Sequence, residues 1–294
     1  MGYQMDIRTA ALSNLGVIRA SGADARNFLH TQLTQDVLNL SESETKLAGY
    51  CSAKGRLYGI FQIFADGETV YLVTRREVIE PIIKRLRMFV LRAKVVFEEA
   101  PLQVQGVCAA DALANQICVK TDDGFRLGVL PATVDGVVWP RELRVSPAVT
   151  GADLADAWDW LDVMAGQPHV ELATYEAFVP QMVNLDRIGG VNFKKGCYPG
   201  QEVVARSHYL GKLKRRMQIA RGVGQVNVGA DVYSSLDASQ PAGQVVGSAV
   251  HDGRTYILYE ISLPLLADDA QVSVAGAAGE WQRLALPYAL SDET

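Results

Sequence analysis

The sequence predicts an α+β protein that ends in a separate all-β unit. Strand-like segments flank Asp66-Gly67, a dipeptide that strongly favours a tight β-hairpin. An amphipathic helical pattern follows, and a second alternation of strands and helices begins near residue 101. Beyond about residue 212, only short strand patterns separated by turns remain. This order of elements indicates antiparallel sheets with helices packed against them, followed by a small barrel or sandwich.

The first α+β unit is expected over residues 1–100. Its predicted helices cover 21–40 and 77–91, and its predicted strands cover 57–64, 69–74 and 94–99. Ser21 is placed to cap the first helix, in which Phe28 and Leu29 belong to an apolar face. The second helix has acidic residues early and basic residues late, which matches the helix dipole.

The second α+β unit is expected over residues 101–210 and the all-β unit over residues 211–294. In the second unit, strands are predicted over 102–109, 125–130, 136–140 and 143–146, and helices over 110–116 and 151–166. In the last unit, strands are predicted over 214–222, 243–250, 255–261, 270–276 and 281–286. Gly166 is the expected C-terminal stop of the long helix. Residues 179–211 therefore lie at a domain junction, where binding sites are frequent.

Composition restricts the classes of function. Of the 294 residues, 49% are hydrophobic and 21% are charged, which is ordinary for a protein with a buried core. The net charge of −5 argues against unspecific binding to nucleic-acid backbones. There is no run of 18 apolar residues, and the N-terminal stretch lacks the features of a signal peptide, so we expect a cytoplasmic protein without a membrane role. The four cysteines have no CxxC pair or zinc-type spacing, which predicts reduced thiols and no tightly held metal.

The stretch KKGCYPGQE, residues 194–202, is the strongest candidate for chemistry. The thiolate is the reactive form of cysteine, and the neighbouring Lys194 and Lys195 would lower the pKa of the Cys197 thiol. The alternative is a small, half-buried cysteine without reactivity, and chemistry alone favours that alternative. None of the four histidines is adjacent to Cys197 in the sequence, so a Cys–His nucleophile pair has no support at this level.

The residues after Cys197 have both a binding and a structural interpretation. Gln201 and Glu202 can hold a ligand by hydrogen bonds, or they can form the first turn of a helix. Arg206 lies four residues after Glu202, and at this spacing an ion pair on one helix face is more common than an anion clamp.

Two further features have the same ambiguity. The basic run GKLKRR, residues 211–216, is ordinarily a solvated strand face, but it can also contact nucleic acid or another polyanion. Trp158 and Trp160 are two positions apart in a predicted helix, so they cannot share a face. At least one of them is expected in or beside a pocket, although packing in the core is the default for Trp158.

The stretch FKKGCYPGQEVVAR resembles the signature K-G-C-Y-x-G-Q-E of the YgfZ-type family, the folate-binding, tRNA-modifying proteins that support iron–sulfur enzymes. Four other segments are also similar to family patterns: SGADARNFLHTQLTQDV, CSAKGRLYGIFQIF, FVPQMVNLDRIGGVNFKKGCYPGQE and LPYAL. The resemblance covers about residue 10 to the terminus. It implies the fold of the glycine cleavage T-protein, in which two α+β domains and a C-terminal small β-barrel are arranged around a central pocket.

The resemblance also indicates where this chain departs from the T-protein, a tetrahydrofolate-dependent aminomethyltransferase. The T-protein pattern has an acidic pair where this chain has Gly59 and Ile60, so aminomethyltransferase activity is not expected. Trp158 matches a tryptophan that relatives use for folate. Met164 stands where an acid is common, and Leu15 stands where some relatives have a second tryptophan. Tetrahydrofolate is therefore the expected cofactor, with its binding weakened or redirected by the missing acid.

The function that the resemblance implies is that of a folate-binding accessory protein, not a classical enzyme. It would support the synthesis or repair of iron–sulfur clusters in a subset of enzymes, including those that methylthiolate tRNA. Its expected partners are iron–sulfur enzymes or assembly factors, and its effect on tRNA is expected to be indirect. Cys197 is the expected working thiol, as a cluster ligand, a sulfur carrier or a redox group, and Lys195 and Tyr198 act beside it. The residues expected to bind the cofactor are Trp158, Lys194, Gln201, Glu202 and Arg206.

Two other classes of function remain open at this level. One is a tetrahydrofolate-dependent one-carbon transferase or demethylase. The other is a module that binds tRNA directly through residues 211–216.

Overall fold

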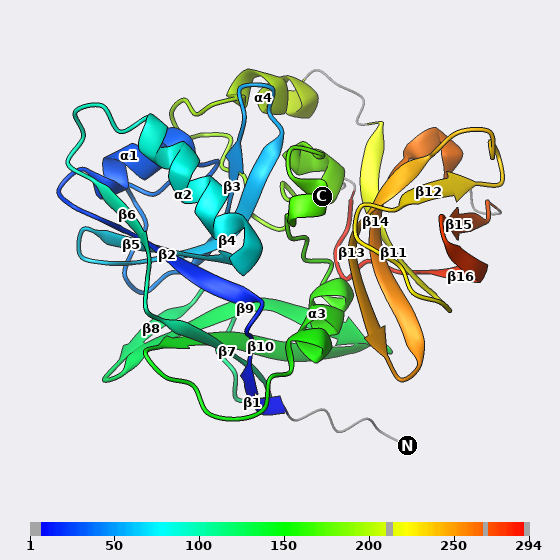
Figure 1. The fold of residues 1–294 in the computed structure, drawn as a ribbon, viewed down its shortest axis with the longest axis horizontal. Helices are drawn as coiled ribbons and strands as arrows, with labels where there is room; N and C mark the ends of the chain where they lie inside the picture. The colour runs from blue at the N-terminus through cyan, green and yellow to red at the C-terminus, as the bar shows by residue number, and fades with distance from the viewer. Residues whose placement is uncertain (1–6, 210–213, 267–269, 291–294) are drawn as a thin grey trace.

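Two five-stranded sheets and a closed six-stranded barrel make up the computed structural model, which describes residues 7–209, 214–266 and 270–290. The first sheet with its helices, the second sheet and the barrel lie around the middle of the molecule (Figure 1). No helix within these ranges is long and apolar enough to cross a membrane.

The first sheet has the strand order β3-β4-β5-β2-β6, and each neighbouring pair is antiparallel. Its strands are β2 (Leu15–Ser21), β3 (Lys46–Cys51), β4 (Leu57–Asp66), β5 (Thr69–Arg75) and β6 (Val96–Glu99). Asp66 pairs with Thr69 across the turn, so the predicted hairpin is confirmed. Helices α1 (Ala25–Gln32) and α2 (Ile79–Met88) bury their apolar faces with this sheet in one core cluster.

The start of α1 differs from the sequence prediction. Ser21 is the last residue of β2 and pairs with Val96, so it does not cap the helix. The helix begins at Ala25, and its N-cap residue Asp24 makes no side-chain cap hydrogen bond. The Asp24 carboxylate instead accepts a hydrogen bond from the backbone N–H of Lys94 at 2.6 Å. Pairing between β2 and β6 therefore outweighs the local capping preference of serine.

The second sheet has the strand order β1-β7-β10-β9-β8 and takes an edge strand from the N-terminal segment. Its strands are β1 (Ile7–Ala11), β7 (Gln103–Cys108), β8 (Cys118–Thr121), β9 (Gly124–Val134) and β10 (Val137–Ser146). Helix α3 (Ala155–Met164) contacts β9 of this sheet and β13 of the barrel. The long helix predicted in this region is confirmed, and Gly166 follows it with a φ of +61°.

Residues 110–116 form turns instead of the predicted short helix. The backbone N–H of Leu113 donates to the buried carboxylate of Glu142 at 2.9 Å, and the N–H of Gln116 donates to the Gly128 carbonyl at 3.0 Å. Backbone donors that a helix would use internally are thus bound by β9 and β10. Tertiary hydrogen bonds outweigh the modest helix propensity of this short segment.

The barrel closes in the order β11-β14-β13-β12-β15-β16. Its strands are β11 (Arg215–Gly222), β12 (Asp231–Ser234), β13 (Gly243–His251), β14 (Arg254–Ser262), β15 (Val272–Val274) and β16 (Ala277–Leu284). Five of them correspond to predicted strands, and β12 is an addition. The remaining elements are α4 (Gln201–Tyr209) and the 3₁₀ helices η1 (Arg76–Val78), η2 (Leu172–Thr174), η3 (Pro180–Val183) and η4 (Leu263–Leu265).

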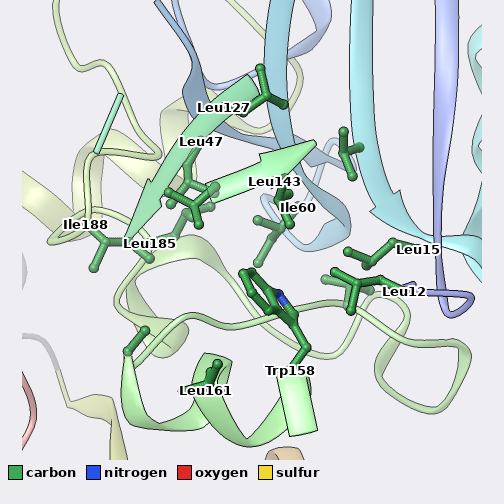
Figure 2. Packing of buried hydrophobic residues seen from close by; sticks show 14 of the residues in the cluster. Leu12, Leu15, Leu47, Ile60, Leu127, Leu143, Trp158, Leu161, Leu185 and Ile188 are labelled. Carbon is green, nitrogen blue, oxygen red and sulfur yellow. The ribbon is translucent and has the colours of Figure 1, made fainter. Parts of the chain in front are cut away.

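Trp158 of α3 lies in the large core cluster that all three units share. Leucine and isoleucine side chains, among them Leu15 of β2 and Leu143 of β10, surround its indole ring (Figure 2). Gly106 of β7 lies against the same ring, and a Cβ at that position would be 2.4 Å from Trp158 Cε3. The second sheet therefore approaches α3 too closely for any side chain at residue 106.

Candidate functional site

The motif loop, residues 194–200, is fastened to the C-terminal end of α1. Lys195 is only 8% exposed, and its Nζ donates hydrogen bonds to the backbone carbonyls of His30 and Leu33, the latter at 2.7 Å. An ammonium group at this position satisfies carbonyls that the last helical turn leaves free, and it complements the negative end of the helix dipole. Burial lowers the pKa of Lys195 to about 8. Lys195 thus anchors the loop and does not point into solvent.

Gly200 holds the other end of the loop against the turn between β3 and β4. Its φ is +79°, and a Cβ would lie 2.4 Å from the Ser52 carbonyl oxygen and 2.6 Å from Gly55 Cα. Because these neighbours are backbone atoms, they cannot move aside cheaply. Helix α4 begins at the next residue, Gln201. The glycine of the motif is therefore required where two chain segments cross.

Cys197 is exposed in this anchored loop, whereas the other three cysteines are buried. Burial raises the pKa of the Cys51 thiol to about 12, and burial is also the main cause that raises the pKa of the Cys118 thiol to about 11. These two thiols remain protonated and inaccessible at pH 7. Cys197 is thus not half-buried, as the alternative expected, and it is the cysteine that a partner can reach.

Tyr198 packs under the anchoring lysine. Its side chain is 7% exposed, and Lys195 Nζ lies 5.0 Å from the centroid of its ring, a cation–π distance. Burial raises the pKa of the Tyr198 hydroxyl, so the phenol is neutral at pH 7. Tyr198 therefore packs against Lys195 and is not ionised near neutral pH.

The polar residues that flank Cys197 lie on the surface. Lys194, Glu202 and Arg206 are exposed, and Gln201 is half-buried. Glu202 is in the first turn of α4 and Arg206 is in its last turn, the placement that suits the helix dipole. None of these four residues lines the cavity beside Trp158.

The basic run over residues 211–216 is only partly described, because residues 211–213 lie outside the described ranges. Within the described part, Arg215 pairs with Glu260 and Arg216 pairs with Asp186, each at 2.6 Å. Both guanidinium groups are thus engaged by carboxylates of the protein, which lowers their capacity to bind a phosphate.

The cavity beside Trp158 is small. Its volume is about 20 Å³, which is room for about one water molecule. Leu15 and Ile60 line it, so the position aligned with a second tryptophan and the second position of the acidic pair meet Trp158 at the centre. Gly59, the first position of that pair, does not line the cavity, and a Cβ there would lie against Ile82 and Phe61. Met164 lines a different cleft, next to the barrel, and the carboxylate that lines the central cavity comes from Asp162.

Asp162 and His169 line the same cavity and belong to a buried polar cluster that no sequence pattern predicted. Arg141 Nη1 and His169 Nε2 each lie 2.8 Å from an oxygen of Asp162. Burial alone would raise the pKa of the Asp162 carboxyl, but His169 and Arg141 hold it at about 2. Within the described chain, Gln167 Oε1 and His169 Nδ1 are buried without a hydrogen-bond partner. The available signal was the pair of acids in WDWLD, each next to large apolar residues of the helix.

A wider cleft opens next to this cluster. Arg75 Nη1 and Asp159 Oδ1, 2.6 Å apart, belong to its wall, and its volume is about 1030 Å³. Asn14 of the first unit and His251 of the barrel also line it, so all three units contribute. Ligand pockets commonly have volumes of about 300–1,000 Å³. The wide cleft has room for a molecule the size of tetrahydrofolate, and the cavity beside Trp158 does not.

The candidate residues therefore form two separate groups. None of residues 194–202 lines the central cavity or the wide cleft. In the ranges that the structure describes, no cluster of three or more His, Cys, Asp or Glu side chains is placed to hold a metal ion. The exposed thiol and the central polar cluster can thus be considered as independent parts of the molecule.

Comparison with known proteins gives relatives that match nearly the whole chain. The tRNA-modifying protein YgfZ of Vibrio vulnificus strain YJ016 is 30% identical over 309 residues, which cover 98% of this chain and 94% of that protein. The protein of the same name from Aliivibrio fischeri strain ES114 is 29% identical and covers 96% of this chain and 92% of its own. The one from Escherichia coli strain S88 is 30% identical over 74% of this chain and 73% of its own. No model of a protein family matches the chain.

Among solved structures, the glycine cleavage system aminomethyltransferase T from Bartonella henselae has the same fold. Its TM-score is 0.61, with coverage of 96% of this chain and 85% of that chain. The sequence identity is 12%, so this likeness concerns the fold alone. The predicted T-protein-like architecture with a C-terminal barrel is confirmed.

Proposed function

The chain belongs to the YgfZ family of tRNA-modifying proteins, and on this premise we propose that it supports tRNA modification through the thiol of Cys197. The observation that carries the proposal is the contrast between the cysteines, of which Cys197 alone is exposed. The loop that presents it is anchored by Lys195 at α1 and by Gly200 at the β3–β4 turn. A thiol held in one place and open to solvent suits reaction with a partner protein.

We propose further that the role is an accessory one. The protein would support the synthesis or repair of iron–sulfur clusters in a subset of enzymes, including those that methylthiolate tRNA. The motif resemblance supports this finer statement. The internal pairing of Arg215 and Arg216 supports an indirect effect on tRNA, because those groups are engaged by carboxylates.

The alternative, a one-carbon transferase or demethylase that uses tetrahydrofolate, has less support. Ile60 lines the central cavity where the transferase pattern has an acid. Asp162 is the carboxylate in that cavity, and it is already bound by Arg141 and His169. A carboxylate with a pKa of about 2 is a poor proton acceptor at pH 7.

Tetrahydrofolate binding remains part of the proposal, although no step of the proposed role passes through it. The cavity beside Trp158 does not fit a pterin ring in this conformation, because it has room for about one water molecule. A molecule the size of tetrahydrofolate fits the adjoining wide cleft, whose wall includes Arg75 and Asp159. Titration with tetrahydrofolate should quench tryptophan fluorescence, and Trp158→Phe should reduce the signal if the pterin reaches the centre.

The central test is complementation of a bacterial strain that lacks its own family member. Wild-type protein should restore methylthiolated nucleosides in tRNA, measured by mass spectrometry, and Cys197→Ala should not. Cys118→Ala is the matched control, because it removes a buried thiol and should restore the methylthiolated nucleosides. Full restoration by Cys197→Ala would refute the proposed role of this sulfur.

A further inference from the structure

A cleft at one end of the barrel belongs to neither group of candidate residues. Its volume is about 700 Å³, and ligand pockets commonly have volumes of about 300–1,000 Å³. The end of β11, the start of β14 and part of β16 form its wall, together with residues 270–271 before β15. It shares no lining residue with the wide cleft or with the cavity beside Trp158. This barrel-end cleft is therefore a separate candidate for a binding site.

The charge of the barrel-end cleft is opposite to that of the whole chain. Arg221, Arg254 and Arg283 line it, and Glu280 is the acid among its lining residues. These four side chains have a formal excess of two positive charges, whereas the chain has a net charge of −5. A cleft lined by an excess of one sign of charge attracts ligands of the opposite sign. The barrel-end cleft is therefore suited to an anion.

Two of these arginines are not neutralised by a carboxylate. Arg221 Nη2 donates to the amide oxygen of Gln282 at 2.6 Å, and the two residues are opposite each other on β11 and β16. Arg254 is exposed, and no described residue forms an ion pair or a side-chain hydrogen bond with it. Arg215 and Arg216 differ, because each is paired with a carboxylate. Arg221 and Arg254 thus keep their charge available for an external anion.

The strand register brings these two arginines close together. Arg221 of β11 is opposite Tyr256 of β14, and Arg254 lies two residues before Tyr256 on the same side of the strand. Diagonal neighbours of this kind are about 7–8 Å apart, so two long side chains can reach one ligand. A ligand with two linked phosphate groups can contact both guanidinium groups.

The wall of the cleft also contains a buried hydrogen-bond donor. Trp281 lines the cleft and is 2% exposed, and its Nε1 has no hydrogen-bond partner within the described ranges. Buried indole N–H groups usually have an acceptor, and a phosphate oxygen can serve as one. Gly222 lies against the same indole, where a Cβ would be 2.6 Å from Cδ2. Because only glycine permits this approach of β11, Trp281 is held in the wall that the arginines share.

We propose that the barrel-end cleft binds a small molecule with two or more phosphate groups. The planar guanidinium groups of Arg221 and Arg254 would each hold phosphate oxygens through paired N–H donors. Gln271 and Gln282, which also line the cleft, supply neutral amide groups that do not repel the ligand. This site goes beyond the proposed function and does not depend on Cys197.

The test is isothermal titration calorimetry of the full-length protein with sodium pyrophosphate at constant ionic strength. We expect saturable binding at one site with a Kd below about 1 mM. Arg254→Gln and Arg221→Gln should each weaken binding by about tenfold, because each removes a charge-assisted contact. Glu280→Gln should strengthen binding by about threefold, because it removes the acid that repels the ligand.

Arg92→Gln is the matched control, because Arg92 is an exposed arginine of the first unit that does not line this cleft. It should leave the Kd for pyrophosphate unchanged, and thermal unfolding shows whether each variant is folded. The proposal is overturned if pyrophosphate gives no saturable binding, or if folded Arg92→Gln weakens binding as much as Arg254→Gln. Because an RNA backbone carries phosphates too, unmodified tRNA is titrated separately. Binding of tRNA but not of pyrophosphate, with loss in Arg254→Gln, would also overturn the assignment to a small molecule.

Discussion

The motif loop and the central cavity use charged groups in opposite ways. At the motif loop, one buried ammonium group binds the end of a helix, and the Cys197 thiol is exposed to solvent. At the centre, the Asp162 carboxylate is buried and bound by Arg141 and His169, and the remaining space is about 20 Å³. The protein has the fold of the aminomethyltransferase, but the cavity beside Trp158 is almost filled by packing, and the exposed thiol of Cys197 lies outside both this cavity and the wide cleft.

The largest expected effect comes from breaking the central cluster. Arg141→Met removes a guanidinium group that is fully buried and leaves Asp162 with His169 alone. An uncompensated buried charge costs about 3–5 kcal/mol, so the free energy of unfolding should fall by about that amount. Urea denaturation of wild type and Arg141→Met measures this difference in the free energy of unfolding. A loss below about 1 kcal/mol would mean that the cluster is not the structural centre described above.

The same cluster makes the free energy of unfolding depend on pH in the acid range. The pKa of Asp162 is depressed to about 2 from its ordinary 3.8, so its stabilising contribution is present above pH 3.8 and is lost as the pH falls from 3.8 to 2. The contribution is about 2 kcal/mol. In Asp162→Asn, the free energy of unfolding should therefore change less steeply over this range than in wild type. Equal slopes in urea titrations at pH 4, 3 and 2 would contradict the assignment.

A smaller effect is expected from releasing the motif loop. Lys195→Met keeps the length of the side chain but leaves the carbonyls of His30 and Leu33 without their donor. Each unsatisfied buried acceptor costs about 1–3 kcal/mol, and water reaching the helix end offsets part of this, so we expect a loss of about 2 kcal/mol. Lys194→Met, at the exposed neighbour, should cost less than about 0.5 kcal/mol. Equal losses in the free energy of unfolding for Lys195→Met and Lys194→Met would contradict the anchoring role of Lys195.

A comparable effect on stability is expected at the crossing of the loop with the β3–β4 turn. Gly200→Ala places a Cβ at a φ of +79° and 2.4 Å from the Ser52 carbonyl oxygen. Backbone strain of this kind costs about 1–3 kcal/mol. Because the loop must move to relieve the clash, iodoacetamide labelling of Cys197 should also change in rate. Gly67→Ala, at a turn with open space around it, is a control that should leave the labelling rate unchanged.

Local patterns predicted several elements correctly, but they placed the Ser21 cap and the helix over 110–116 incorrectly and divided β10 into two strands. The hairpin at Asp66-Gly67 and the long helix that precedes Gly166 were predictable because backbone conformation at these points depends on adjacent residues. Ser21 and residues 110–116 were not, because partners on β6, β9 and β10 take the hydrogen bonds that a local cap or helix would use. Only the tertiary fold brings those partners within reach.

The candidate site also has a part that the sequence could predict and a part that only the fold shows. The motif around Cys197 stands out in the sequence because a long and unusual run of residue types is informative by itself. The surroundings of the motif do not stand out, since the His30 and Leu33 carbonyls that bind Lys195 are some 160 positions away in the sequence and reach it only because α1 ends beside the loop. In the same way, Asp162 is one acid in a predicted helix at the level of the sequence. Only the fold brings Arg141 and His169 into contact with it.

The sequence by itself therefore determined the family, the division into an α+β body and a final all-β unit, and the cysteine to examine. These depend on residue type and on short-range backbone preferences. The tertiary structure decided that this cysteine is exposed, that its loop is held by a buried lysine, and that the pocket beside Trp158 is closed. These properties depend on contacts between segments that are distant in the chain, and such contacts follow from the packing of three units around one centre.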